Sequence, residues 1–407
     1  ENKQLSHYDT LIKLLEEKNE KLNQDIQKLS NKDEQKENDN TLSSNSKHSS
    51  TYTLDLLRSS KLLKIFSGHS NNVNSLQYFS FDGDRFLCSG SSDNTARVWD
   101  LDNNKQIQIF NGHSGTVYSA KFSPYHRNHN RPTICSASYD NTIRFWDIKT
   151  AKEYQTFKEN STYALTIQFS SFTDGKYLCS GSSDGTIRLW DVETSKALHV
   201  FNGHGNGVWC VEFSPLQSSS KDTNNIGVIG GAGYTICSGS SDKTIRLWDI
   251  ENTKQLVAFN GHEGYVPSVK YSRNETSIVG GNVICSGSGD KTVRLWDIRT
   301  GKQIHIFKGH TSYVWAVEYL PSENGGSDTS IICSGSGDNT IRFWDIRTNK
   351  QLHEIKGFDD DNGIYSFEFV PFDQGLKNNE KSKNNTSECC GYTLCYGSRN
   401  GLIRVLG

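Results

Sequence analysis

The dipeptide Trp-Asp recurs along this chain, and its spacing constrains the fold more than any other feature. The six copies follow one another at intervals of 44 to 58 residues and begin at Trp99, Trp146, Trp190, Trp248, Trp296 and Trp344. A repeat of this period is typical of supersecondary units that cannot bury their apolar faces alone and therefore stack on one another. The chain is thus predicted to form a repeat architecture.

Each repeat unit has the pattern of four short strands. An alternating segment such as VWAVEY at 314–319 is followed by a polar loop and then by ICSGS, a tight turn, TIRLWD and KQIHIF. The turn consists of Asp followed by Asn, Gly or Lys. Asp-Asn and Asp-Gly tolerate the positive φ that a two-residue hairpin turn requires. The second and third strands of each unit are therefore predicted to be antiparallel neighbours.

Gly-His pairs precede most of the units, with the imidazoles at His69, His113, His204, His262 and His310. Because they recur in register with Trp-Asp over about 350 residues, these pairs closely resemble the WD-repeat β-propeller family. The resemblance implies an all-β propeller of four-stranded antiparallel blades.

The number of outer strands predicts how the ring closes. Seven segments resemble KQIHIF, and they lie at 61–66, 105–110, 152–157, 196–201, 254–259, 302–307 and 350–355. The first precedes any Trp-Asp, whereas no such segment follows GLIRVL at the end of the sequence. We therefore predict a seven-bladed propeller over residues 60–407, closed by strand 61–66 beside the segment near Ile403. This pairing leaves no inner strand edge open.

Five units contain the same Ser, His, Asp and Trp side chains at fixed offsets, and a Ser-His-Asp set can form a hydrolytic triad. An enzyme needs only one activated nucleophile, however, whereas this set is copied five times. The resemblance implies a buried hydrogen-bond network instead, so we predict no catalytic residue and a non-enzymatic protein. The predicted network residues are His69, Ser89, Asp93, Trp99, His113, Ser136, Asp140, Trp146, His204, Ser238, Asp242, Trp248, His262, Ser286, Asp290, Trp296, His310, Ser334, Asp338 and Trp344.

The third and seventh units depart from this pattern. The third has Asn160 where His is expected but keeps Ser180, Asp184 and Trp190. The seventh begins with Gly357-Phe358 and has Tyr396, Asn400 and Leu406 in place of Ser, Asp and Trp. We expect the seventh blade to be the least rigid or the most specialised.

Cysteine and arginine also follow the repeat. Cys88, Cys135, Cys179, Cys237, Cys285, Cys333 and Cys395 occupy one position in successive units, so each is predicted to be a small buried apolar residue without a disulfide. Many thiols of this kind favour a reducing compartment, the cytoplasm or the nucleus. The arginines at the third-strand position are expected to pair with neighbouring carboxylates or with water. We predict no metal and no cofactor.

The positions that differ between units indicate where a partner could bind. In propellers of this family the loops before the first strand and between the second and third strands share one face, where peptides commonly bind. The candidate partner-binding residues on that face are Tyr118, Tyr139, Tyr163, Leu165, Trp209, Tyr265, Tyr313, Trp315 and Tyr365. Aromatic side chains give a large contact area at a low entropic cost. The alternative is that they only fill the mouth of the central channel.

Residues 1–30 carry a heptad pattern. The apolar or register-setting positions are Leu5, Tyr8, Ile12, Leu15, Asn19, Leu22, Ile26 and Leu29. β-Branched residues at position a with Leu at position d favour a parallel two-stranded coiled coil, and one Asn at position a fixes its register. We expect a homodimer or a pair with another chain, the alternative being a single amphipathic helix. Residues 31–59 are rich in Asn, Ser, Lys and Glu and are predicted to be a flexible linker.

Charge and hydropathy exclude several functions. The formal net charge is −2, which disfavours an electrostatic grip on nucleic acid, and no apolar run approaches the roughly 18 residues that a membrane helix needs. We therefore predict a scaffold or adaptor that binds other proteins. The layout also resembles heterotrimeric G-protein β subunits and chromatin or transcriptional co-regulator adaptors. Because the sequence begins at Glu1 and contains no Met, we expect that an upstream segment is missing.

Overall fold

The computed structural model describes residues 54, 57–81, 83–129, 131–158, 162–171, 173–214, 235–272, 283–321, 330–372 and 391–407. The chain divides into two units, Glu1–Ser49 and Ser50–Gly407. The whole first unit, with the predicted coiled coil from Leu5 to Leu29, lies outside the described residues. All the helices and strands described lie in the second unit.

The second unit consists of seven four-stranded antiparallel sheets, which we number as blades 1 to 7. Within a blade, strands a to d run from the innermost to the outermost. Blade 1 contains β2 (Val73–Phe81), β3 (Asp84–Ser91), β4 (Ala96–Asp100) and β5 (Lys105–Phe110). Blade 2 contains β6 (Val117–Phe122), β7 (Thr133–Ser138), β8 (Thr142–Asp147) and β9 (Glu153–Lys158), with the short helix α3 (Pro124–Asn128) between β6 and β7. Blade 3 contains β10 (Ala164–Phe169), β11 (Tyr177–Ser182), β12 (Ile187–Asp191) and β13 (Lys196–Phe201).

The later blades repeat this order. Blade 4 contains β14 (Val208–Phe213), β15 (Thr235–Ser240), β16 (Ile245–Asp249) and β17 (Gln255–Phe259). Blade 5 contains β18 (Ser268–Tyr271), β19 (Val283–Gly287), β20 (Thr292–Asp297) and β21 (Lys302–Lys308). Blade 6 contains β22 (Val314–Tyr319), β23 (Ile331–Ser336), β24 (Thr340–Asp345) and β25 (Lys350–Lys356). Blade 7 contains β26 (Ile364–Phe372), β27 (Gly391–Ser398), β28 (Ile403–Leu406) and, as its outer strand, β1 (Leu62–Phe66).

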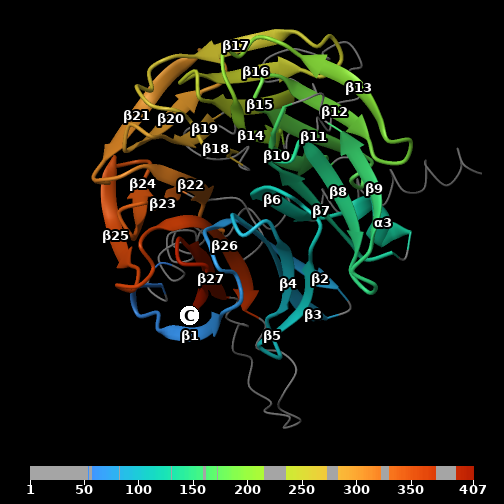
Figure 1. Cartoon of the computed structure of the whole chain (residues 1–407). Coiled ribbons are helices and arrows are strands. Elements are labelled where there is room, and N and C mark those ends of the chain that lie inside the picture. The colour runs from blue at the N-terminus through green and yellow to red at the C-terminus, as the bar shows by residue number, and fades with distance from the viewer. Residues whose placement is uncertain are drawn as a thin grey trace, which may run out of the picture. The chain divides into compact units, whose positions relative to one another are not determined.

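The blades form a closed ring (Figure 1). Each strand a contacts strand a of the next blade, and β26 of blade 7 contacts β2 of blade 1. The predicted seven-bladed propeller is therefore confirmed.

Strand β1 closes the ring by pairing with β28, as predicted. Phe66 lies opposite Ile403 and Leu62 lies opposite Leu406 in an antiparallel ladder. Lys61 and Gly407 extend the ladder, because each backbone N–H donates to the carbonyl of the other at 3.0 and 3.1 Å. Figure 1 shows the blue β1 alongside the red strands at the other end of the chain.

The core lies between successive blades. Phe259 and Leu247 of blade 4, for example, pack in one buried cluster with Trp296 and Val269 of blade 5. This arrangement follows from strands such as β15 and β23, in which every residue is buried because both sheet faces are covered. Since each apolar face needs the neighbouring blade, no blade is complete by itself.

The segment before β1 is also packed. Leu54 and Leu57 are 4 % and 1 % exposed and belong to a core cluster with Leu320, Ile331 and Leu394 of blades 6 and 7. The last part of the predicted linker therefore contributes to the core, and the folded unit begins before residue 60. Sequence analysis missed this because two leucines in a polar segment carry no periodic signal.

The repeated cysteines are buried in strand b of every blade, as predicted. No disulfide joins the eight cysteines of the described residues. Burial raises the pKa of the Cys88 thiol to about 12, which keeps it protonated and unreactive. Cys389 and Cys390, which do not follow the repeat, lie outside the described residues.

Candidate functional site

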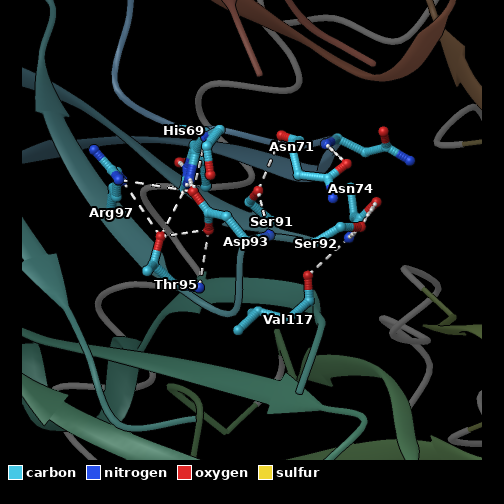
Figure 2. A network of polar contacts seen from close by, with 12 residues as sticks. His69, Asn71, Asn74, Ser91, Ser92, Asp93, Thr95, Arg97 and Val117 are labelled. Atoms are coloured by element: carbon cyan, nitrogen blue, oxygen red, sulfur yellow. Dashed lines mark hydrogen bonds and ion pairs between the residues drawn. The ribbon is translucent and has the colours of Figure 1, made fainter. Parts of the chain in front are cut away.

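Each regular blade joins its strands through one buried polar network. Figure 2 shows the part of it that contains His69, Asp93 and Thr95 in blade 1. His69 lies between two partners: its Nδ1 is 2.8 Å from Asp93 Oδ2 and its Nε2 is 2.7 Å from Ser89 Oγ. Trp99 donates its indole N–H to the same Ser89 Oγ at 2.9 Å. Asp93 also accepts from Thr95. The network fastens the loop before strand a to the b–c turn and to strand c.

The same network recurs in blades 2, 4, 5 and 6, and all twenty predicted residues take part in it. The His–Asp distances are 2.7 to 2.9 Å, and the His–Ser and Trp–Ser distances are 2.7 to 2.9 Å throughout. One proton arrangement satisfies every group: His Nδ1–H donates to Asp, the Ser hydroxyl donates to Nε2, and indole N–H donates to Ser.

The protonation states support a structural role. Burial lowers the pKa of His69 despite the neighbouring carboxylate, so the imidazole is neutral. Burial alone would raise the pKa of Asp93, but the hydrogen bonds from His69 and Thr95 outweigh it and hold this pKa well below its usual range. Ser89 is fully buried, and its oxygen also accepts from Trp99. A substrate therefore cannot reach the hydroxyl, and the set does not resemble a working nucleophile.

The Gly before each His is required by close packing. At Gly68 an added Cβ would lie 2.5 Å from Arg97 Nη1 and 3.0 Å from Cη2 of Trp99. Arg97 cannot easily withdraw, because Nη1 donates to Gln106 at 2.6 Å and Nη2 lies 3.7 Å from Asp93. The repeated arginines thus pair with side chains of their own blades.

Blade 3 retains part of the network. Trp190 donates to Ser180 Oγ at 2.9 Å, and Arg188 pairs with Asp184 at 3.1 Å. Thr162 in the loop before strand a donates to Asp184 at 3.2 Å. Asn160, at the expected His position, lies outside the described residues.

Blade 7 has a different buried network that the sequence analysis missed. Asp361 is fully buried and accepts from the Tyr396 hydroxyl at 2.7 Å and from Arg404 Nε at 2.8 Å. The guanidinium of Arg404 lies 4.2 Å from the centroid of Phe358, which stands at the His position. Burial and the adjacent carboxylate raise the pKa of Tyr396, so the phenol remains a donor. The signal was present as three consecutive aspartates, 359–361, after Gly357-Phe358.

Five of the predicted partner-binding aromatics form a continuous row on the face where the loops before strand a and the b–c turns lie, which we call the upper face. The ring of Trp315 stacks on Tyr365 at 4.9 Å, and Tyr265 lies 5.7 Å from Trp315. Trp209 then contacts Tyr265 at 6.1 Å and Tyr118 at 5.8 Å. Five rings from five blades therefore connect without a gap.

Three further tyrosines lie on the same face. Tyr139 and Tyr163 stack at 3.7 Å, and their hydroxyl groups are 3.0 Å apart. Tyr313 lies 5.5 Å from Tyr265. Tyr139 and Tyr313 are each 46 % exposed, so the band is accessible from the upper face. We use "aromatic band" below for Tyr118, Tyr139, Tyr163, Trp209, Tyr265, Tyr313, Trp315 and Tyr365.

Leu165 is the exception among the predicted contact residues. It is only 7 % exposed, and its Cδ1 lies 3.3 Å from the position a Cβ would take on Gly207. The side chain is covered because the Gly-rich loop before β14 packs over it. Leu165 therefore fills the space beneath the surface and is not an exposed contact residue.

The upper face of blade 1 is polar where the others are aromatic. Asn74 donates to Ser92 Oγ and to the carbonyl of Val117, both at 3.0 Å (Figure 2). Ser91 donates to the carbonyl of Asn71 at 3.1 Å. The aromatic band thus has a defined break at blade 1.

Six segments of the chain match the WD domain, G-beta repeat, at residues 60–100, 104–147, 152–191, 195–249, 253–297 and 301–345. They cover more than half of the sequence, and the chain belongs to this family of WD-repeat proteins. Propellers of this family generally serve as protein-interaction scaffolds and are typically not enzymes. The inner strands of blade 7 lie outside the matched segments, in agreement with their different network.

No curated protein matches the chain. Among the described residues, no helix is long and apolar enough to cross a membrane. Within the same residues, no three His, Cys, Asp or Glu side chains are grouped so that they could hold a metal ion.

Proposed function

We propose that this protein is a scaffold or adaptor whose aromatic band binds peptide segments of partner proteins. The contacts between the rings support this proposal: rings of blades 2, 4, 5, 6 and 7 form one connected set. On the same face, Tyr139 of blade 2 stacks on Tyr163 of blade 3. A repeat scaffold does not need large rings at these positions, because blade 1 is complete with Asn74 there.

The chemistry of the band suits a peptide. Tyr and Trp present large apolar faces at a small entropic cost, and they also offer hydroxyl and indole N–H groups. The indole N–H of Trp209 is engaged with Ser241 Oγ at 2.6 Å, which fixes the ring. Rigid, partly exposed rings of this kind are typical of the residues that dominate a protein interface.

Affinity capture with the intact chain and with a Trp209→Ala/Trp315→Ala variant tests the proposal. Partners bound to the native protein should be lost from the variant. The matched control is Phe81→Ala/Ile107→Ala, which removes exposed apolar side chains away from the band. Circular dichroism establishes that both variants fold. Unchanged capture by the folded tryptophan variant would reject the band as the binding face.

Pairing through the N-terminal segment is a second part of the proposal. The heptad positions from Leu5 to Leu29 support it, because Ile at position a with Leu at position d favours two parallel helices. Two linked propellers would bind partners with two motifs more tightly by raising the effective concentration. Sedimentation should show a dimer for the full chain and a monomer for residues 51–407. A full chain that is soluble only with a small helical partner would instead favour a subunit similar to G-protein β.

The buried cysteine thiols support a proposal for the cellular compartment of the protein. The buried cysteines stand in adjacent blades without disulfides, as in a reducing environment such as the cytoplasm or the nucleus. Imaging of the tagged chain, and thiol labelling after denaturation of protein isolated from its source, test this placement.

A further inference from the structure

The residue after the turn Asp, or after Asn400 in blade 7, has a left-handed backbone in every blade. Its φ lies between 65° and 89° at Asn94, Asn141, Gly185, Lys243, Lys291, Asn339 and Gly401. Gly and Asn adopt this conformation readily, whereas longer side chains adopt it at a cost in conformational energy. Five blades therefore carry the residue that the turn favours, and blades 4 and 5 carry lysine.

Both lysines stand beside the aromatic band. Lys243 is two residues after Ser241, whose hydroxyl accepts the indole N–H of Trp209 at 2.6 Å. Lys291 is two residues after Gly289, where an added Cβ would lie 2.7 Å from the ring of Tyr265. Lysine thus replaces the favoured turn residue at two positions next to the proposed contact surface.

A third lysine joins them on the upper face. Lys308 ends strand β21 and lies opposite Thr292, the residue after Lys291. Lys243, Lys291 and Lys308 are all exposed, and within the described part of the chain none of them makes an ion pair. We call these three residues the lysine rim.

The acidic residues nearby leave the lysine rim with a positive charge. Asp242 and Asp290 are held by His204 and His262 at 2.8 Å, and each also faces an arginine of its own blade. Glu263, in the loop that enters blade 5, is an exposed carboxylate on the same face. Three ammonium groups against one carboxylate favour an acidic ligand.

We infer that the lysine rim binds carboxylates of the partner, so that the segment recognised by the aromatic band is an acidic peptide with an aromatic or apolar anchor. This inference rests on the proposed function and specifies its partner. A single-stranded oligonucleotide is negatively charged like an acidic peptide, and its bases also stack on aromatic rings. The peptide is favoured because the rings of the band pack largely against one another and the rim contains no arginine.

A displayed library of random linear peptides, selected on the full chain, tests the inference. Selected peptides should be enriched in Asp and Glu next to an aromatic or apolar residue. Their affinity should fall roughly tenfold for Lys243→Asn/Lys291→Asn and should decrease at higher ionic strength. The matched control is Lys254→Asn/Lys302→Asn, which removes two exposed lysines at the opposite face of the same blades.

A stability measurement separates binding from structure. Because Asn is favoured at both turn positions, Lys243→Asn/Lys291→Asn should have an unchanged or higher melting temperature while it binds peptide more weakly. A variant that binds weakly because it is unstable would overturn the inference.

Peptides that need Trp209 and Trp315 but show no acidic enrichment, or bind the lysine variant equally well, overturn the inference and leave the proposed function intact. Oligo-dT or oligo-U that binds through the lysines while no acidic peptide is selected also overturns it. If no peptide is selected, or if the selected peptides bind the folded tryptophan variant equally well, the proposed function fails and the inference fails with it.

Discussion

Blade 7 and the five regular blades solve the same packing problem with different chemistry. In a regular blade a neutral imidazole connects a buried hydroxyl to the carboxylate of the b–c turn, as His262 does between Ser286 and Asp290. In blade 7 a buried carboxylate, Asp361, is held by a phenol and a guanidinium. Both networks fasten the loop before strand a to strands b and c, so the fold requires the connection and not a particular set of residues.

The two networks differ in how much the buried carboxylate depends on a single charged side chain. The turn carboxylate of a regular blade has several donors, including His, Thr and backbone N–H groups. Asp361 is fully buried, and Arg404, which is 3 % exposed, supplies its compensating positive charge. A buried charge that loses its partner is strongly destabilising. The closing blade should therefore tolerate substitution less well than the others.

The largest expected effect comes from Arg404→Leu, which would leave Asp361 buried without its counter-charge. We expect a loss of about 3–5 kcal/mol of unfolding free energy. The matched change, Arg97→Leu in blade 1, should cost about 1 kcal/mol, since Asp93 keeps its bonds from His69 and Thr95. Urea denaturation followed by circular dichroism measures both. Equal losses would show that the two networks are equivalent.

A smaller loss is expected for Tyr396→Phe, which removes one hydrogen bond to Asp361 without changing the shape of the core. The cost should be about 1–3 kcal/mol, because the buried carboxylate oxygen keeps only the backbone N–H of Phe358. Thermal unfolding of the variant against the native chain measures it. An unchanged transition would mean that water or a rearranged side chain replaces the phenol.

Restoring the repeat residue in blade 7 should not help. Asn400→Asp places a carboxylate at the turn, but Phe358 stands where an imidazole would be needed. The change also removes the donor that bonds the carbonyl of Asp360 at 2.7 Å. We expect a loss of about 1 kcal/mol in the same denaturation assay. A gain in stability would contradict the view that blade 7 has its own network.

The comparison extends into the central channel. Lys270 of blade 5 lies 3.4 and 3.0 Å from Glu212 and Glu318 of the adjacent blades. Glu368 of blade 7, in contrast, makes no ion pair within the described part of the chain and faces Lys121, Glu318 and Lys270. Burial of the carboxyl raises its pKa to about 7, with repulsion from Glu318 adding to the shift and attraction by Lys121 and Lys270 opposing it.

The sign of this shift predicts a pH effect, the mildest of the four expected changes. The folded protein holds the proton of Glu368 more tightly than the unfolded chain does. The resulting stabilisation is complete below the unfolded pKa of about 4.3 and is lost as pH rises through about 7. Glu368→Gln should therefore match the native melting temperature at pH 5 and exceed it at pH 8. Glu318→Gln, which breaks an ion pair with Lys270, should be less stable at both values.

The sequence predicted most of the architecture because the repeat samples each position several times. The ring of seven blades, the closing pair β1–β28 and the twenty network residues all follow from side chains that recur in register. The blade 7 network could not be found in this way, since Asp361 stands three residues beyond the His position and has no counterpart in the other blades. A residue that occurs in one blade only, such as Asp361, is recognised from its three-dimensional contacts.

In the candidate site, too, some features follow from the repeat and others depend on three-dimensional contacts. Spacing from Gly-His and from the turn Asp indicated aromatics that lie on one face, because equivalent positions in adjacent blades point to the same mouth. The burial of Leu165 depends on the loop over it, and the lysine rim depends on backbone φ values at Lys243 and Lys291, which the sequence does not display.

The pairing of β1 with β28 has a consequence for the life of the chain on the ribosome. The first strand of the propeller must wait for the last one, since its partner is translated only at the far end of the unit. During synthesis the early blades can stack, but the faces that will meet at the junction of blades 7 and 1 stay uncovered until β28 has left the exit tunnel. A ribosome that stalls late in this message would therefore release an incomplete ring with an exposed seam, a natural target for chaperones.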